Sequence, residues 1–127
     1  MTHYNITCVG KPGKGTEAKS IPGYIFSFGG GRYGVTNKQY NEAGEIVTGG
    51  GWKITELTTG FICYGKYART KREAVDGFIK ALAGDANGYK ATIEQAISRY
   101  FEKGNKDANP GLIPKNEILI ARGTIQN

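Results

Sequence analysis

Residues 52–82, WKITELTTGFICYGKYARTKREAVDGFIKAL, change their pattern of apolar residues midway. Trp52–Leu57 and Phe61–Gly65 are both rich in β-branched and aromatic residues, which is typical of strands. Between them lies Thr58-Thr59-Gly60, and Gly60 suits the left-handed position of a three-residue hairpin loop. The first half of this stretch therefore predicts a β-hairpin.

The second half of the stretch predicts a helix. Thr70 and Glu73 match a capping box, in which two side chains satisfy free backbone donors at a helix start. Apolar residues then recur at the i, i+3, i+4 and i+7 spacing of one helix face, namely Val75, Phe78, Ile79 and Leu82. Gly84 supplies a stop at the C-terminal end.

A second helix is predicted after Asn87-Gly88, with Gly104 as its end. One apolar stripe runs along it, formed by Tyr89, Ile93, Ala96, Ile97, Tyr100 and Phe101. Because the link through Gly84–Gly88 is short, we expect the two helices to be antiparallel neighbours.

Strand patterns dominate the chain before residue 52. Alternating residues mark a first strand at Tyr4, Ile6 and Cys8, and a second with one face formed by Tyr24, Phe26 and Phe28. Arg32–Lys38 predicts a third strand, followed by a turn at Asn41–Gly44. A weak return strand at Glu45–Thr48 is expected to stop at the glycine triplet 49–51.

After the second helix, residues 104–116 predict a polar loop and Glu117–Arg122 a last strand. The expected fold is α+β, a single domain over residues 1–127. It consists of an antiparallel β-sheet of about five to seven strands packed against two antiparallel helices, because an apolar sheet face needs cover.

Composition narrows the classes of function. The chain has 127 residues and 17 Lys and Arg against 11 Asp and Glu, a net charge of +6, which favours an anionic partner. A single His and two distant Cys argue against a metal site and against acid–base catalysis. We expect no enzyme activity and no cofactor, and neither a membrane span nor a secretory signal.

Two groups of residues are candidates for binding an anion. Lys66, Arg69, Lys71 and Arg72 lie where the hairpin enters the first helix, whose N-terminus carries free amides and a positive dipole end. The alternative is a solvated basic edge that discourages pairing between sheets.

The second group consists of Arg99, Asn105 and Arg122, which converge if the last strand returns beside the helix end. Arginines grip phosphates through forked hydrogen bonds, and Tyr100 or Phe101 would stack on a base. The alternative places Tyr100 and Phe101 in the core and the two arginines on the surface.

Residues 52–82, together with Ser20–Phe26 (SIPGYIF), resemble the phage anti-Thoeris sponge family, which captures cyclic ADP-ribose signals. The resemblance implies a homo-oligomer in the host cytoplasm that sequesters a small anionic nucleotide without cleaving it. It also implies a pocket with arginines for phosphates, an aromatic residue for adenine and an asparagine. Here Arg69 or Arg72, with Asn105 and Arg122, would take these roles, and Tyr100 or Phe101 is the nearest aromatic residue.

Two other functions remain open. One is a phage inhibitor of the anti-CRISPR kind that binds a host defence protein or nucleic acid. The positive charge argues against a mimic of DNA but is compatible with gripping RNA or DNA. The other is an arm-type DNA-binding module of a recombinase, which would not need the second helix.

Overall fold

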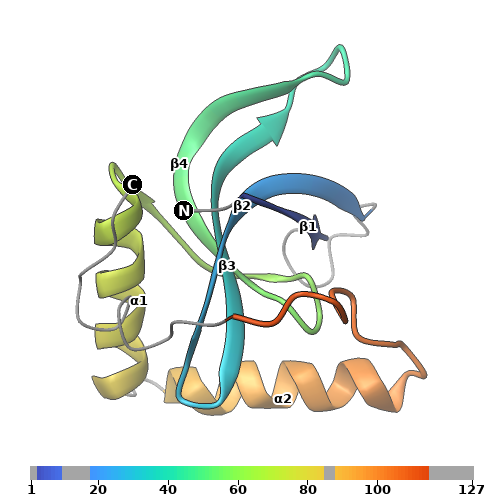
Figure 1. Ribbon diagram of the computed structural model, residues 1–127. Helices are drawn as coiled ribbons and strands as arrows, with labels where there is room; N and C mark the ends of the chain where they lie inside the picture. The colour runs from blue at the N-terminus through green and yellow to red at the C-terminus, as the bar shows by residue number, and fades with distance from the viewer. Residues whose placement is uncertain (1–2, 10–17, 85–87, 115–127) are drawn as a thin grey trace.

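Five antiparallel strands follow one another across one sheet in chain order (Figure 1). The computed structural model describes residues 3–9, 18–84 and 88–114, and only the backbone of residues 66 and 67. The strands are β1 (Tyr4–Cys8), β2 (Lys19–Phe28), β3 (Gly31–Tyr40), β4 (Ile46–Glu56) and β5 (Ile62–Ala68). With the helices α1 (Lys71–Gly84) and α2 (Tyr89–Glu102), they confirm the predicted α+β fold.

The predicted hairpin and helix start are confirmed in detail. Gly60 has φ +77° and its N–H donates to the carbonyl of Glu56 at 2.9 Å, which closes the turn between β4 and β5. At α1, the N–H of Glu73 donates to Thr70 Oγ1 at 3.1 Å. The Glu73 carboxylate accepts from the N–H of Arg69 at 3.1 Å, so both residues of the capping box are used.

The glycine triplet 49–51 does not end a strand, contrary to the prediction. Thr36 pairs with Lys53 and Lys38 pairs with Thr48, so residues 49–52 of β4 lie opposite Asn37 alone. Gly50 and Gly51 adopt φ values of +76° and +70°, which other residues rarely take. The glycines therefore form a large bulge, with four residues opposite one, through which β4 continues.

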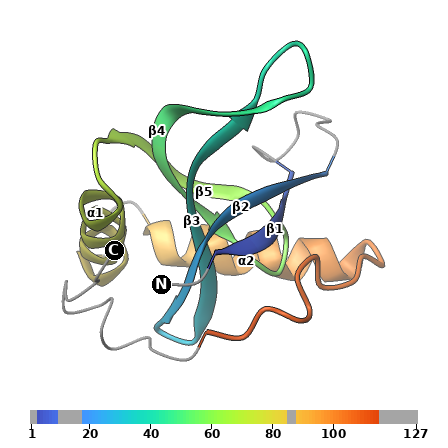
Figure 2. The ribbon, with the colours of Figure 1, turned by 45° about the horizontal axis from the view of Figure 1, so that its top comes forward.

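The helices are not side by side. Figure 1 shows α1 standing beside the sheet and α2 lying crosswise at its lower end, and Figure 2 agrees. Each helix buries its apolar stripe mainly on the sheet, and the two helices meet where Phe78 of α1 packs edge to face on Tyr89 of α2, with 6.1 Å between centroids. Phe78 of α1 packs against Phe26 and Tyr33, while the Tyr89 hydroxyl of α2 donates to the carbonyl of Cys63. The prediction that the two helices lie antiparallel and side by side is therefore wrong.

Two clusters of buried apolar side chains lie on the two faces of the sheet. The larger is centred on Phe26, Val35, Ile54 and Phe78, beneath the helices. The smaller, formed by Ile6, Ile25 and Leu57, lies within the curl of the sheet. The curl is closed where the N–H of Val9 donates to the carbonyl of Gly60 at 2.7 Å.

Residues 105–114, here called the strap, return from α2 across the start of the sheet (Figure 1). Asn109 is 4% exposed, and its amide bonds to both backbone groups of Thr7 and to the carbonyl of Leu57. The predicted polar loop thus supplies, through the Asn109 side chain, the hydrogen bonds that a neighbouring strand would otherwise make to the edge of β1. The predicted strand Glu117–Arg122 lies outside the described residues.

Neither of the two described helices is long and apolar enough to cross a membrane.

Candidate functional site

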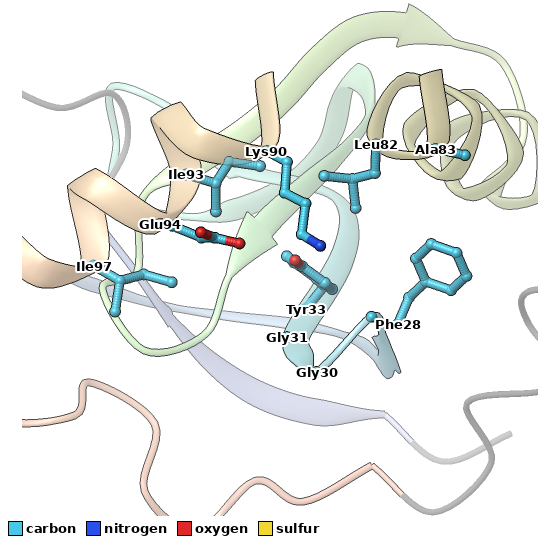
Figure 3. A pocket seen from close by; sticks show the side chains of 11 residues that line it. Phe28, Gly30, Gly31, Tyr33, Leu82, Ala83, Lys90, Ile93, Glu94 and Ile97 are labelled. Atoms are coloured by element: carbon cyan, nitrogen blue, oxygen red, sulfur yellow. The ribbon is translucent and has the colours of Figure 1, made fainter. Parts of the chain in front are cut away.

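A hollow of about 530 Å³ lies where the β2–β3 turn meets both helices (Figure 3). Its walls are mostly apolar, with contributions from Phe28, Leu82, Ala83, Ile93 and Ile97. Gly29, Gly30 and Gly31 of the β2–β3 turn complete the wall of the hollow. A Cβ at Gly31 would collide with the Tyr33 hydroxyl, so this position has no room for a side chain.

The charges in this hollow balance. Figure 3 shows Lys90 and Glu94 of α2 reaching toward it together with the hydroxyl of Tyr33. Burial, followed by the nearby Cys63, Glu56 and Glu94, raises the pKa of Tyr33, so its hydroxyl stays neutral. One cation and one carboxylate beside apolar walls do not make a phosphate site.

A second hollow, of about 480 Å³, lies at the C-terminal end of α2 and is called the α2 hollow below. Residues on one face of α2 line it together with side chains of other segments, namely Val9, Phe61, Ala96, Arg99, Tyr100, Lys103 and Asn105. The i, i+3, i+4, i+7 spacing of residues 96, 99, 100 and 103 explains why they share this face.

The end of α2 brings Asn105 back to the hollow. Gly104 has φ +84°, which turns the chain immediately after the helix. Asn105 Nδ2 then donates to the carbonyl of Tyr100 at 3.1 Å, and the Tyr100 hydroxyl donates to the carbonyl of Lys106 at 2.8 Å. The ring of Phe61 meets that of Tyr100 edge to face, with 6.1 Å between centroids. The aromatic wall is therefore held from both sides.

The α2 hollow is positively charged. Arg99 and Lys103 are exposed, and neither forms an ion pair with any described residue. No carboxylate, histidine or cysteine is among the described residues that line it. Burial raises the pKa of Tyr100, and the charges of Asp107 and Glu56 act in the same direction. Tyr100 therefore offers a neutral hydroxyl beside two cations.

The residues predicted near α1 do not join this group. Arg69 lines a separate hollow of about 260 Å³ beside Trp52 and the glycine bulge, and Arg72 is exposed on the first turn of α1. Figures 1 and 2 place the start of α1 and the end of α2 on opposite sides of the molecule. Within one protomer, Arg69, Arg72 and Arg99 therefore do not surround one ligand.

The N-terminus of α1 is also less open to an anion than its sequence indicates. Glu73 already supplies a carboxylate there, bonded to the N–H of Arg69. Lys71 turns inward, is 3% exposed and holds its ammonium 3.8 Å from the ring centroid of Tyr24. Burial lowers the pKa of Lys71. The side chain of Lys66 lies outside the described part of the chain.

Of the second predicted group, Arg99, Tyr100 and Asn105 meet in the α2 hollow. Phe101 is 49% exposed and points away from the core stripe, although its ring touches that of Tyr100 with 5.9 Å between centroids. Arg122 lies outside the described residues.

Sequence reasoning missed Lys103 and Phe61. The spacing of Lys103 from Arg99, one helical turn, is a signal that would have found it. Phe61 had no such signal, because it is distant in sequence and reads as part of a strand.

The chain matches no protein-family model, no curated protein and no solved structure. Among the described residues, no three His, Cys, Asp or Glu side chains come together in a way that could hold a metal ion.

Proposed function

We propose that the α2 hollow binds a small phosphorylated nucleotide and holds it without cleaving it. The observation that carries this proposal is that Arg99, Lys103, Tyr100 and Asn105 line one hollow with no carboxylate among them. Two cations suit two phosphates, and an aromatic ring beside them suits a base.

Each side chain has a distinct task in this proposal. The planar fork of Arg99 takes two oxygens of one phosphate, and the Lys103 ammonium takes the other as a point charge. The wall of Tyr100 and Phe61 faces the base. Asn105 uses one amide hydrogen on the carbonyl of Tyr100, which leaves its oxygen to accept from an exocyclic amino group such as that of adenine.

Sequestration fits this lining better than catalysis does. General acid–base chemistry needs a group that exchanges a proton near neutral pH. The described lining supplies two cations and a tyrosine whose pKa is raised by burial, and none of these groups meets that need. The nucleotide would therefore leave the hollow unchanged.

The expected affinity indicates a role for a second copy. Two charge-assisted contacts and one stacked base contribute roughly 4–9 kcal/mol before ordering costs. Nanomolar binding requires about 12 kcal/mol. Because Arg99, Lys103 and Asn105 are exposed, one protomer gives micromolar or weaker binding, and tighter retention needs a partner copy over the open side.

This proposal extends to a biological role through the resemblance to the anti-Thoeris sponges. A phage protein that retains a cyclic ADP-ribose signal in the host cytoplasm would counter a defence system that depends on it. The resemblance supports this role, and the lining of the α2 hollow supports the nucleotide binding that the role requires.

Isothermal titration with the isomers of cyclic ADP-ribose tests the proposal. We expect heat of binding from at least one isomer, and chromatography afterwards should recover that isomer intact. Arg99→Ala should raise Kd about tenfold or more. Arg72→Ala, which removes another exposed arginine, outside the hollow, should leave Kd unchanged. The absence of heat with every isomer, together with no nucleotide retained during purification, would overturn it.

A further inference from the structure

Another hollow, of about 200 Å³, lies inside the curl of the sheet, and all five strands contribute to its lining. We call it the concave groove. Its cations are Lys19 of β2, Lys38 of β3 and Lys53 of β4. Its other described lining residues are Cys8, Val9, Ile21, Thr36, Gln39, Tyr40, Thr55 and Ile62, so no carboxylate is present among them.

Lys38 and Lys53 are half-buried in the wall of the groove. A lysine commonly buries its stem along the sheet and keeps its ammonium in water, where an anion from outside can reach it. The described residues contain one ion pair, Arg32 with Asp107, and it lies outside the groove. Two ammonium groups on one wall without a described counter-charge therefore favour an anion from outside the chain.

The lysines of the concave groove are held in place by other residues. Lys19 lies over the ring of Tyr40 at 4.9 Å from its centroid, and the Tyr40 hydroxyl donates to the carbonyl of Ser20 at 2.8 Å. The ammonium of Lys38 donates to Thr48 Oγ1. That of Lys53 lies over Gly50, where a Cβ would come within 2.8 Å of it. The glycine bulge thus makes room for a cation.

We propose that the concave groove binds the phosphodiester backbone of single-stranded nucleic acid, separately from the nucleotide site in the α2 hollow. The groove is too small to enclose a nucleotide, and a single lysine ammonium that stays in contact with water contributes little to binding one isolated phosphate. A polyanion that crosses the sheet touches several lysines in turn and releases counterions at each. A single strand follows a shallow curved surface more closely than a stiff duplex does.

Fluorescence anisotropy with a labelled oligothymidylate of about 20 nucleotides tests this proposal. Near 0.1 M salt, Lys38→Gln and Lys53→Gln should each weaken binding about fivefold, and each should lower the salt slope by about 0.7. Lys38→Arg and Lys53→Arg keep the charge and should bind nearly as the unmodified protein does. Lys80→Gln, which removes an exposed lysine of α1 outside the groove, should have less effect than either.

Three results would overturn the proposal. The first is no binding, or binding without salt dependence, by the unmodified protein, which does not depend on any variant folding. The second is an equal loss with Lys80→Gln, which would show an effect of net charge alone. The third is equal or tighter binding of a duplex of the same length. Lys38→Gln and Lys53→Gln should leave the Kd for the cyclic ADP-ribose isomers unchanged, because neither lysine lines the α2 hollow, so failure here and failure at the α2 hollow are distinguishable.

Discussion

The guanidinium of Arg32, in β3, forms an ion pair with the carboxylate of Asp107, in the strap, with 2.6 Å between Nη2 and Oδ2. The same guanidinium donates to the carbonyls of Asn109 at 2.9 Å and Leu112 at 3.0 Å. A single side chain of the sheet therefore fixes most of the length of the strap. The strap also carries Asn105, so this anchor supports one wall of the α2 hollow.

Replacement of Arg32 should loosen the strap. Arg32→Ala removes an ion pair and leaves two strap carbonyls without their donor, so we expect a loss of about 2–4 kcal/mol in the free energy of unfolding. Urea denaturation measures the loss. Arg72→Ala is the control and should change stability by less than about 0.5 kcal/mol, because that arginine is exposed. Equal stability of the two variants would show that the anchor is not needed.

Two phenylalanines, one on each helix, should differ sharply in how much they contribute to the free energy of unfolding. Phe78 is fully buried at the centre of the larger cluster, so Phe78→Ala should cost about 3–5 kcal/mol. Phe101 is 49% exposed, and Phe101→Ala should cost less than about 1 kcal/mol. Thermal unfolding followed by circular dichroism compares them. A similar cost for both would mean that Phe101 is covered in solution, as a contact between copies would require.

A matched pair of glycines separates backbone strain from crowding. Gly60 and Gly44 have nearly the same φ, +77° and +80°, so alanine carries a similar strain of about 1 kcal/mol at each. At Gly60, a Cβ would also come within 3.0 Å of the Thr7 carbonyl and of Val9. Gly44 has open space around it. Gly60→Ala should therefore lower stability in chemical denaturation by more than Gly44→Ala does, and equal losses would contradict the close approach of β1.

Stability should fall as the pH rises above about 9. Burial raises the pKa of the Cys63 thiol above its usual value of 9.0. The unfolded chain then loses this proton first, so the free energy of unfolding falls once the pH passes the unfolded value, by up to about 1.4 kcal/mol per pH unit. Tyr33 and Tyr89 act in the same direction above about pH 10, because burial raises their pKa values too.

Urea denaturation of Cys63→Ala between pH 8 and 10 checks this expectation. The variant should lose less stability over that range than the unmodified protein does, whatever its stability at pH 7. Lys71 acts in the opposite direction, since burial lowers its pKa and deprotonation relieves the cost of its charge. Parallel pH profiles for the two proteins would show that Cys63 is not the group responsible.

Local rules predicted most of the secondary structure. Gly60 took the left-handed position of its turn, and Thr70 and Glu73 formed the cap of α1, because these effects involve residues close in sequence. The glycine triplet misled the prediction. Glycine is a strand breaker in isolation, whereas here the neighbouring strand keeps its pairing on both sides of the bulge.

Tertiary relationships were less accessible from the sequence. Arg99 and Asn105 could be placed together because only the last turn of α2 and the stop residue Gly104 separate them. The basic residues near α1 gave no sign that Lys71 would turn inward onto Tyr24, since that contact depends on how α1 packs against β2. Nor did a polar loop indicate that Asn109 would be buried, because its partners belong to β1 and to the end of the β4 segment.

The bonds between Asn109 and Thr7 join residues 102 positions apart. During synthesis on the ribosome, β1 emerges before the other described strands, but its outer edge has no amide to meet until residue 109 has been translated. Contacts of this sequence separation slow folding. We therefore expect the nascent sheet to expose an uncapped edge throughout elongation, when a chaperone that shields strand edges would be of most use to it.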